Sequence, residues 1–350
     1  MALATGKLST RNGGRRVNLA LGLLLVVATL TGSGANTIGV DWPIDLIQVH
    51  AAAALALLLL APWKSLVVRR SLSRRRGQPV RWLSFVLLAS VLLTIGSGLL
   101  HATGSVEHVG PLTLMQIHVG AAVVALLALT GHFRLHPVRP RPTDADRRAL
   151  LRAAAVGGGA ALAVAAWETG LNASGASGGQ RRFTGSVEKP RGVPSAMPVT
   201  SWFDDRVPRL DADEWRLHVG DSDWDLAMIR ALPQESFAAT LDCTGGWFAE
   251  QDWEGVRLSA VLAAADLART EAWRSLEVRS VTGYARWFGS GTLDDVWLVT
   301  RVGGAPLSYG HGYPARIVAP GRRGFWWVKW VASLQPSSRP AWVQSVFPLS

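Results

Sequence analysis

The segment Leu241-Asp242-Cys243-Thr244-Gly245-Gly246-Trp247 contains the only cysteine of the 350 residues. A single cysteine cannot form a disulfide within its chain, and a free thiol in an exported protein is open to oxidation. One thiolate is still useful as a soft ligand to a metal that other groups also hold. The rest of the chain therefore decides whether Cys243 serves a metal.

The composition is typical of a membrane protein. Apolar residues make up 49% of the chain, the mean hydropathy is +0.20, and the formal net charge is +11. The basic residues lie in short blocks beside apolar runs, a pattern that indicates membrane topology rather than nucleic-acid binding. We therefore expect membrane lipid as a partner and no nucleic acid.

Five apolar runs in the first half are each close to the length of about 20 residues that a membrane-spanning helix needs. They cover residues 17–35, 44–62, 82–101, 113–133 and 149–167. The tail and alternate loops are basic (1–16, 64–81 and 134–148), whereas the loops 36–43 and 102–112 contain no Lys or Arg. The positive-inside rule predicts a multi-pass protein of the cell membrane, with a cytoplasmic N-terminus and an extracytoplasmic domain after Trp167.

The first four helices, within 17–135, are predicted to be two copies of a helical hairpin. Gln48-Val49-His50 recurs as Gln116-Ile117-His118, and Thr31-Gly32-Ser33-Gly34 recurs as Ile95-Gly96-Ser97-Gly98. Such internal similarity is the signature of a structural repeat. The repeat places one histidine at the same depth in each hairpin.

Histidine inside a membrane is costly and indicates a functional site. His50 and His118 are therefore candidate ligands to the iron of one b-type haem, in a domain that resembles a cytochrome b. The alternative is a pair of interhelical hydrogen bonds. His132 faces the same way as His118, but its counterpart in the repeat is Lys64, so a second haem is not predicted.

The fifth helix begins with Asp146-Arg147-Arg148-Ala149-Leu150-Leu151-Arg152 and continues into a weakly apolar run. Twin arginines before such a run resemble a twin-arginine export signal, although an ordinary stop in a basic loop is the alternative. We expect 136–168 to be an uncleaved signal and anchor. It would use the twin-arginine machinery, while the general insertion machinery inserts the first four helices. Residues 169–198, rich in Gly, Ser and Pro, are predicted to be a linker.

Residues 199–350 show a different pattern. Runs at 215–219, 276–280 and 296–300 alternate between apolar and polar residues as strands do, and 258–267 has the pattern of one short helix. This segment is long enough to form its own core. We predict an α+β, β-rich domain that follows an all-α membrane bundle of five helices.

Three motifs in this domain carry a resemblance. They are the segment 241–247 with the following Trp253-Glu254-Gly255-Val256, the stretch from Gly303 to Pro320, and Lys329-Trp330-Val331. In this order they resemble the molybdopterin-binding domain of the sulfite oxidase fold. The similarity is greatest to small bacterial members such as the catalytic subunit of periplasmic methionine sulfoxide reductase.

The resemblance implies that Cys243 is the catalytic thiolate on molybdenum, beside the dithiolene sulfurs of molybdopterin. Arg316 and Lys329 match basic positions that hold the phosphate and ring of the pterin. The remaining implied cofactor contacts are His311, Ser280 and, in the loop 200–203, Thr200. The alternatives are a surface position for Arg316, a turn histidine at 311 and an inert buried thiol at 243.

Three features of the sequence bear on function. Sulfite oxidases carry an arginine after the cysteine that helps to bind an oxyanion, whereas Gly246, Trp247 and Phe248 follow here, which argues against sulfite. The chain stops soon after Lys329, so no immunoglobulin-like dimerisation domain is expected. The sequence also contains no Cys-x-x-Cys-His motif, and therefore no site for a c-type haem.

The expected function is that of a membrane-anchored molybdenum oxidoreductase that transfers oxygen atoms to or from an extracytoplasmic substrate. Electrons would pass between molybdenum and quinone, or another redox partner, through the b-type haem. One alternative is a molybdopterin enzyme with a haem-free anchor and a soluble electron partner. Another is a non-catalytic cofactor-binding module.

Overall fold

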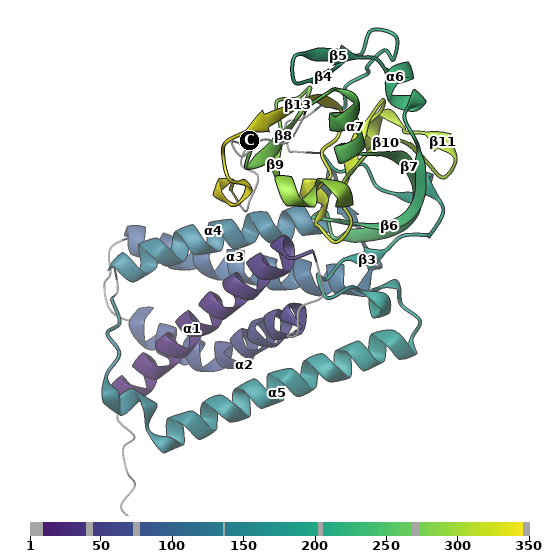
Figure 1. Ribbon diagram of the computed structural model, residues 1–350. Helices are drawn as coiled ribbons and strands as arrows, with labels where there is room; N and C mark the ends of the chain where they lie inside the picture. Colours follow the sequence, from purple (N-terminus) through teal and green to yellow (C-terminus); the bar gives the residue numbers. More distant parts are fainter. Residues whose placement is uncertain are drawn as a thin grey trace, which may run out of the picture. The chain divides into compact units, whose positions relative to one another are not determined.

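The computed structural model describes residues 10–39, 45–72, 78–135, 137–201, 206–267 and 273–345. The chain divides into two compact units (Figure 1). The N-terminal unit comprises Met1–Ala35 and Trp42–Val187, and the C-terminal unit comprises Asn36–Asp41 and Glu188–Ser350.

The N-terminal unit is built of long helices. They are α1 (Thr10–Thr37), α2 (Leu46–Leu72), α3 (Gln78–Thr103), α4 (Leu114–Leu135) and α5 (Arg147–Ala173). All 5 contain a stretch long and apolar enough to cross a membrane, which confirms the helices predicted from the five apolar runs. Large apolar side chains such as Leu88, Leu127 and Leu162 are exposed on these helices, as expected of a surface that contacts lipid. α3 packs on α4 and α5 on α2, and a two-stranded hairpin connects α3 to α4, formed by β1 (His108–Val109) and β2 (Leu112–Thr113).

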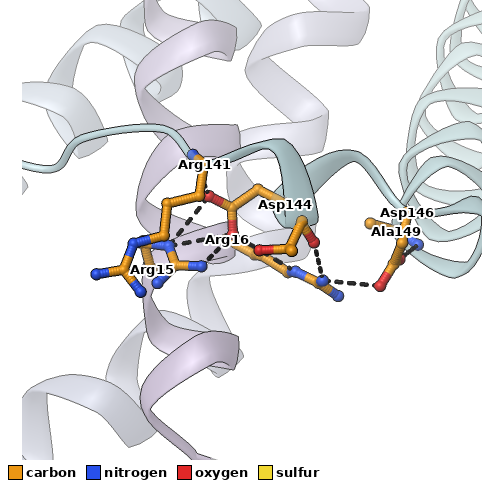
Figure 2. A network of polar contacts seen from close by, with 7 residues as sticks. Arg15, Arg16, Arg141, Asp144, Asp146 and Ala149 are labelled. Carbon is orange, nitrogen blue, oxygen red and sulfur yellow. Dashed lines mark hydrogen bonds and ion pairs between the residues drawn. The ribbon is translucent and has the colours of Figure 1, made fainter.

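Ion pairs connect the start of α1 to the turn before α5 (Figure 2). Arg15 donates through Nη2 to Asp144 at 2.6 Å, and Arg16 donates through Nη2 to Asp146 at 2.7 Å. Asp146 also accepts the backbone N–H of Ala149 and so caps the N-terminus of α5. The residues before the twin arginines are therefore anchored to the first helix.

The C-terminal unit contains two sheets. The strands of the six-stranded sheet are β3 (Val187–Glu188), β6 (Glu235–Cys243), β7 (Trp247–Arg257), β10 (Trp297–Val302), β11 (Ala305–Pro306) and β12 (Arg316–Val318). Those of the five-stranded sheet are β4 (Leu217–Val219), β5 (Ser222–Trp224), β8 (Ser275–Ser280), β9 (Ala285–Gly289) and β13 (Val331–Ser337). The predicted β-rich α+β class is confirmed.

The six-stranded sheet runs β11-β10-β7-β3, with β12 beside β10 and β6 beside β7. The five-stranded sheet runs β5-β4-β13-β8-β9, with β13 parallel to β4. Two short helices, α6 (Leu226–Ala231) and α7 (Leu258–Ala264), complete the unit. The predicted strands coincide with β4, β8 and β10, and the predicted helix with α7. Apolar side chains from both sheets form the core, in which Trp253 and Trp327 are fully buried.

The predicted linker is partly ordered structure. α5 ends at Ala173 rather than at residue 168. Further on, the Lys189 N–H donates to the Phe248 carbonyl at 2.8 Å and the Gly192 N–H donates to the Glu250 carbonyl at 3.3 Å. The end of the segment therefore pairs with β7. The backbone groups of a strand need hydrogen-bond partners, and a partner that is distant in sequence cannot be recognised from local composition.

Candidate cofactor site

Cys243 is the last residue of β6, where the hairpin to β7 begins. Its carbonyl accepts the Gly246 N–H at 3.1 Å, and its sulfur accepts the Gly245 N–H at 3.4 Å. Gly246 has φ 88°, a left-handed conformation that favours glycine and closes this short connection. Cys243 is buried, with 8% of the residue exposed.

Arg316 of β12 is a buried cation that lacks a carboxylate partner in the described part of the chain. It is 1% exposed, so it is not a surface strand residue. Its Nη1 donates to the His311 carbonyl at 3.0 Å and its Nη2 to the Trp327 carbonyl at 3.2 Å. Burial lowers the pKa of Arg316 to about 10, and Cys243 acts in the opposite direction. A buried guanidinium with neutral acceptors only is suited to an anionic ligand.

Lys329 and Thr200 lie beside this arginine and the cysteine turn. Lys329 Nζ donates to the Thr200 carbonyl at 2.8 Å and to the Gly310 carbonyl at 2.7 Å. Thr200 Oγ1 accepts the indole N–H of Trp247 at 3.1 Å. Four predicted site residues from distant parts of the chain thus converge: Cys243, Arg316, Lys329 and Thr200.

His311 joins the same group as a neutral residue. It lies in a short turn, Tyr309–His311, with a buried side chain. Its Nε2 lies 3.1 Å from the Met197 carbonyl, which can only accept, so Nε2 carries the proton and Nδ1 accepts from Ser308 Oγ at 2.7 Å. Burial, and then the positive charges of Arg316 and Lys329, lower the pKa of His311 to about 4.

Ser280 lies opposite Val331 of β13, two residues after Lys329. It ends β8 in the other sheet, and its hydroxyl accepts the Thr282 N–H at 3.2 Å within a tight turn. A contact between Ser280 and the cofactor stays a prediction. In the predicted loop 200–203, Trp202 and Phe203 lie outside the described residues. The neighbouring Ser201 has a buried hydroxyl with no hydrogen-bond partner among the residues described.

The residues present fit molybdopterin on these observations. The cofactor brings a phosphate and a polar ring, and the site brings an uncompensated buried cation at Arg316 and an orphaned hydroxyl at Ser201. Buried polar groups require partners, so a ligand that supplies acceptors resolves both. The single thiolate of Cys243 then adds a soft metal ligand at the edge of the same group.

Two arginines near this site were missed by sequence reasoning. Arg286 is 2% exposed, and its Nη2 has no hydrogen-bond partner in the ranges that the structure describes. Arg286 and Arg322 both lie over the Trp326 ring, at 5.2 and 4.4 Å from its centroid. No carboxylate pairs with either within the described residues. The one available signal was the doublet Arg322-Arg323 directly after the family-like stretch that ends at Pro320.

In the N-terminal unit, His50 and His118 face each other. Their ring centroids are 5.8 Å apart. Each Nδ1 donates at 2.8 Å to a carbonyl of the preceding helix, Ala28 for His50 and Thr94 for His118. The interhelical hydrogen bonds of the alternative reading therefore exist, and they leave Nε2 of both rings available. This is the orientation that a carbonyl imposes on a metal-ligating histidine.

Glycines open the space around both histidines. A Cβ at Gly32 would lie 2.9 Å from His50 Cε1, and a Cβ at Gly98 would lie 3.0 Å from His118 Cε1. Gly32 is thus the counterpart of Gly98, and the predicted pairing of Gly32 with Gly96 was wrong. The error arose because the pairing followed the short Gly-Ser-Gly pattern, whereas helix contacts set the register.

Two further polar contacts join helices among the described residues of this unit. Lys64 Nζ donates to Asn18 Oδ1 at 2.7 Å, and His132 Nδ1 lies 3.5 Å from Ser84 Oγ. Each pair joins the two helices of one hairpin. Lys64 and His132 thus occupy corresponding positions, and the number of haems stays a prediction.

The C-terminal unit is similar to known proteins. Residues 204–343 match the family model described as the oxidoreductase molybdopterin binding domain. This domain has the molybdopterin-binding fold of the sulfite oxidase type. The match covers the strands and loops that carry Cys243, Arg316 and Lys329.

Individual relatives of the chain are sulfite oxidases. Mitochondrial sulfite oxidase of Homo sapiens is 30% identical over an alignment of 167 residues that covers 37% of this chain and 31% of the relative. That of Rattus norvegicus is 29% identical over an alignment of 171 residues that covers 39% of this chain and 31% of the relative. The chain thus spans about 31% of the length of these relatives. The sulfane dehydrogenase SoxCD from Paracoccus pantotrophus is 24% identical, with a TM-score of 0.36 over 38% of this chain and 40% of that chain.

The low pKa of His311 gives a testable pH dependence. In the unfolded chain histidine titrates near 6.5, so between pH 6.5 and 4 the unfolded state binds more protons and stability falls with acidification. We expect His311 to contribute a loss of about 2 kcal/mol between pH 7 and pH 5. Denaturant unfolding of the full chain in detergent, wild type against His311→Gln, measures it. The exposed His218→Gln is the control, and equal pH slopes in wild type and His311→Gln would contradict the assignment.

Proposed function

We propose that the protein is a membrane-anchored molybdenum oxidoreductase that acts on an extracytoplasmic substrate. The observation that carries the proposal is the convergence of Cys243, the uncompensated Arg316 and Lys329 in a domain with the molybdopterin-binding fold. The membrane anchor is supported by the five apolar helices, and the side of the membrane by the basic loops of the sequence.

The chain's own residues have distinct roles in this proposal. Cys243 would ligate molybdenum through its sulfur, toward which the Gly245 N–H points. Arg316 and Lys329 bind the anionic part of the cofactor, for which charge-assisted hydrogen bonds are suited. Neutral His311 fixes the backbone beside Arg316 through Met197 and Ser308. When bound, the cofactor supplies two-electron redox chemistry, of which oxygen-atom transfer is the form proposed here.

Replacement of Cys243 tests this assignment. We expect Cys243→Ser to abolish turnover, because an alcohol is a poor soft-metal ligand, and Arg316→Gln to lower molybdenum content. Metal analysis measures the molybdenum content. Turnover is measured on sulfoxides and N-oxides with viologen or quinol as the electron donor, and on sulfite with an electron acceptor. Arg301→Gln, which breaks a half-exposed pair with Glu254, is the control. Wild-type protein with molybdenum but no turnover on any substrate would favour the non-catalytic module, and protein without molybdenum would refute the proposal.

The substrate proposed here carries a negative charge near the reacting atom. Gly246, Trp247 and Phe248 supply no cation after Cys243, but Arg286 and Arg322 lie on and beside the loop 322–326. This loop meets the cysteine directly, since a Cβ at Gly324 would lie 3.0 Å from Cys243 Cα. Two guanidinium groups without carboxylates favour an anion over a neutral sulfoxide. The missing arginine after the cysteine therefore does not by itself exclude sulfite.

Arg322→Gln separates anionic from neutral substrates. Loss of a charged hydrogen bond is worth about 1.5–3 kcal/mol, so we expect KM for sulfite to rise roughly 10-fold or more. KM for dimethyl sulfoxide should change little, because a neutral substrate does not need the charge. Steady-state kinetics of both substrates measure the ratio. An equal change in KM for both substrates would refute a role of Arg322 in binding the charge of the substrate.

We further propose that His50 and His118 bind one b-type haem that passes electrons between molybdenum and quinone or another redox partner. Imidazole–metal bonds of about 2 Å on both sides of one metal place the ligating nitrogens about 4 Å apart. The two rings, whose centroids are 5.8 Å apart and whose planes are inclined by 70°, are compatible with this spacing. The haem-free anchor with a soluble electron partner is the competing function.

A reduced-minus-oxidised spectrum tests the haem. We expect wild-type protein to show b-type haem absorbance, and His50→Ala and His118→Ala each to lose it, since one ligand is removed from a two-ligand site. His132→Ala is the matched control on the same helix as His118 and should keep the spectrum. Absence of haem from wild-type protein purified with all its histidines would favour the haem-free anchor.

Export by the twin-arginine machinery completes the proposal, with insertion of α1 to α4 by the general machinery. The arginines Arg147 and Arg148 form the first turn of α5 after the cap residue Asp146. The folded state of an exported domain suits a cofactor that is inserted in the cytoplasm. The basic residues before α5 support a cytoplasmic location for the network of Figure 2.

A further inference from the structure

One buried ion pair lies directly against the backbone of the proposed molybdenum ligand. Asp242 precedes Cys243 at the end of β6, and Arg323 lies in the loop after β12. Their side chains are 4% and 2% exposed and are joined by an ion pair between Arg323 Nη1 and Asp242 Oδ1. Buried pairs of this kind are costly to form, and removal of one partner leaves an uncompensated charge.

The loop of Arg323 contacts the Cys243 backbone in two further ways. Arg323 Nη2 donates to the Cys243 carbonyl at 3.3 Å. The main chains of Asp242 and Arg323 form a parallel β-bridge, and Gly324 leaves no room for a side chain against Cys243 Cα. The carbonyl of Cys243 is therefore held by Arg323 as well as by the Gly246 N–H.

The charges of the two buried arginines near Cys243 differ in their compensation. Arg316 has no carboxylate partner in the structure as described, whereas Arg323 is balanced by Asp242. Arg323 also donates through Nε to the Asn36 carbonyl at 3.3 Å, so each of its nitrogens has a protein acceptor. The hydrogen-bonding groups of Arg323 are thus used within the protein, and its effect on a bound metal would pass through Cys243.

From this arrangement we infer that Arg323 is a positioning residue, which fixes the backbone of Cys243 and, with Asp242, sets the reduction potential of the metal that the thiolate binds. The inference rests on the proposed molybdenum function. Groups that orient a metal ligand typically change metal affinity or activity 10–100-fold when they are removed. The ion pair is neutral as a whole. Removal of either charge should therefore shift the reduction potential in opposite directions, which tests the electrostatic effect.

Three variants separate charge from structure in the molybdenum-loaded full chain. Asp242→Asn leaves the cation unpaired and should raise the reduction potential, whereas Arg323→Gln leaves the carboxylate unpaired and should lower it. The double variant restores neutrality and should return the potential toward the wild-type value. A redox titration followed by the Mo(V) electron paramagnetic resonance signal measures all three. Shifts in the same direction, or none, would overturn the electrostatic role.

Arg323→Lys tests the positioning part. Lysine keeps the charge but lacks the planar fork that reaches Asp242 and the Cys243 carbonyl together. We expect a potential near that of the wild type with an altered Mo(V) line shape. An unaltered line shape would overturn the positioning role. The matched controls are Glu235→Gln and Arg257→Gln, which break an ion pair of 2.7 Å at the other end of β6 and should leave both readouts unchanged.

A measurement without molybdenum covers variants that fail to load the cofactor. Cys243 is the only thiol of the chain, so alkylation of cofactor-free protein by iodoacetamide reports this residue alone. Arg323→Gln and Arg323→Lys should each change the alkylation rate, because the Cys243 carbonyl loses the Arg323 hydrogen bond that fixes it and the sulfur shifts relative to its surroundings. Equal rates would overturn the inference. Wild-type protein that binds no molybdenum would instead refute the proposed function, and the two failures are thus distinct.

Discussion

The cost of burying a cation is the constraint on which the C-terminal domain depends. A guanidinium removed from water must find acceptors, and full compensation requires an anion. Arg323 obtains one from Asp242 and is fixed to the protein. Arg316 obtains only carbonyls, which leaves a positive charge for a ligand next to Cys243. The same domain thus holds one arginine whose charge the protein balances and one whose charge is available to a cofactor.

An equivalent constraint acts on the helices of the N-terminal unit. Polar atoms among apolar side chains need partners, and His50 and His118 each obtain one by donating Nδ1 to a carbonyl of the neighbouring helix. Because both hairpins use the same contact, the two rings meet with their other nitrogens unused by these bonds. Gly32 and Gly98 permit the close approach. The same interaction therefore joins the helices of each hairpin and fixes the orientation of both rings.

The predictions succeeded where a local pattern or a contiguous motif carried the information. Apolar runs located all five helices, and alternation located β4, β8 and β10. The motif around Cys243 and the stretch that ends at Pro320 led to residues that do converge. The predictions failed or fell short where the partner is remote in sequence. Arg323 pairs with Asp242 across 81 residues, the repeat register followed helix contacts, and the end of the predicted linker pairs with β7.

The sequence by itself determined the five long apolar helices, the β-rich domain and the lone thiol as a candidate metal ligand. These follow from periodicity, charge distribution and short motifs, all of which involve residues close together in the sequence. Only the tertiary structure decided which charges are balanced: Asp242 takes Arg323, while Arg316, Arg286 and Arg322 receive no carboxylate within the described residues. The physical reason is that burial and pairing depend on residues brought together by folding, and two arginines with identical side chains differ only in what surrounds them.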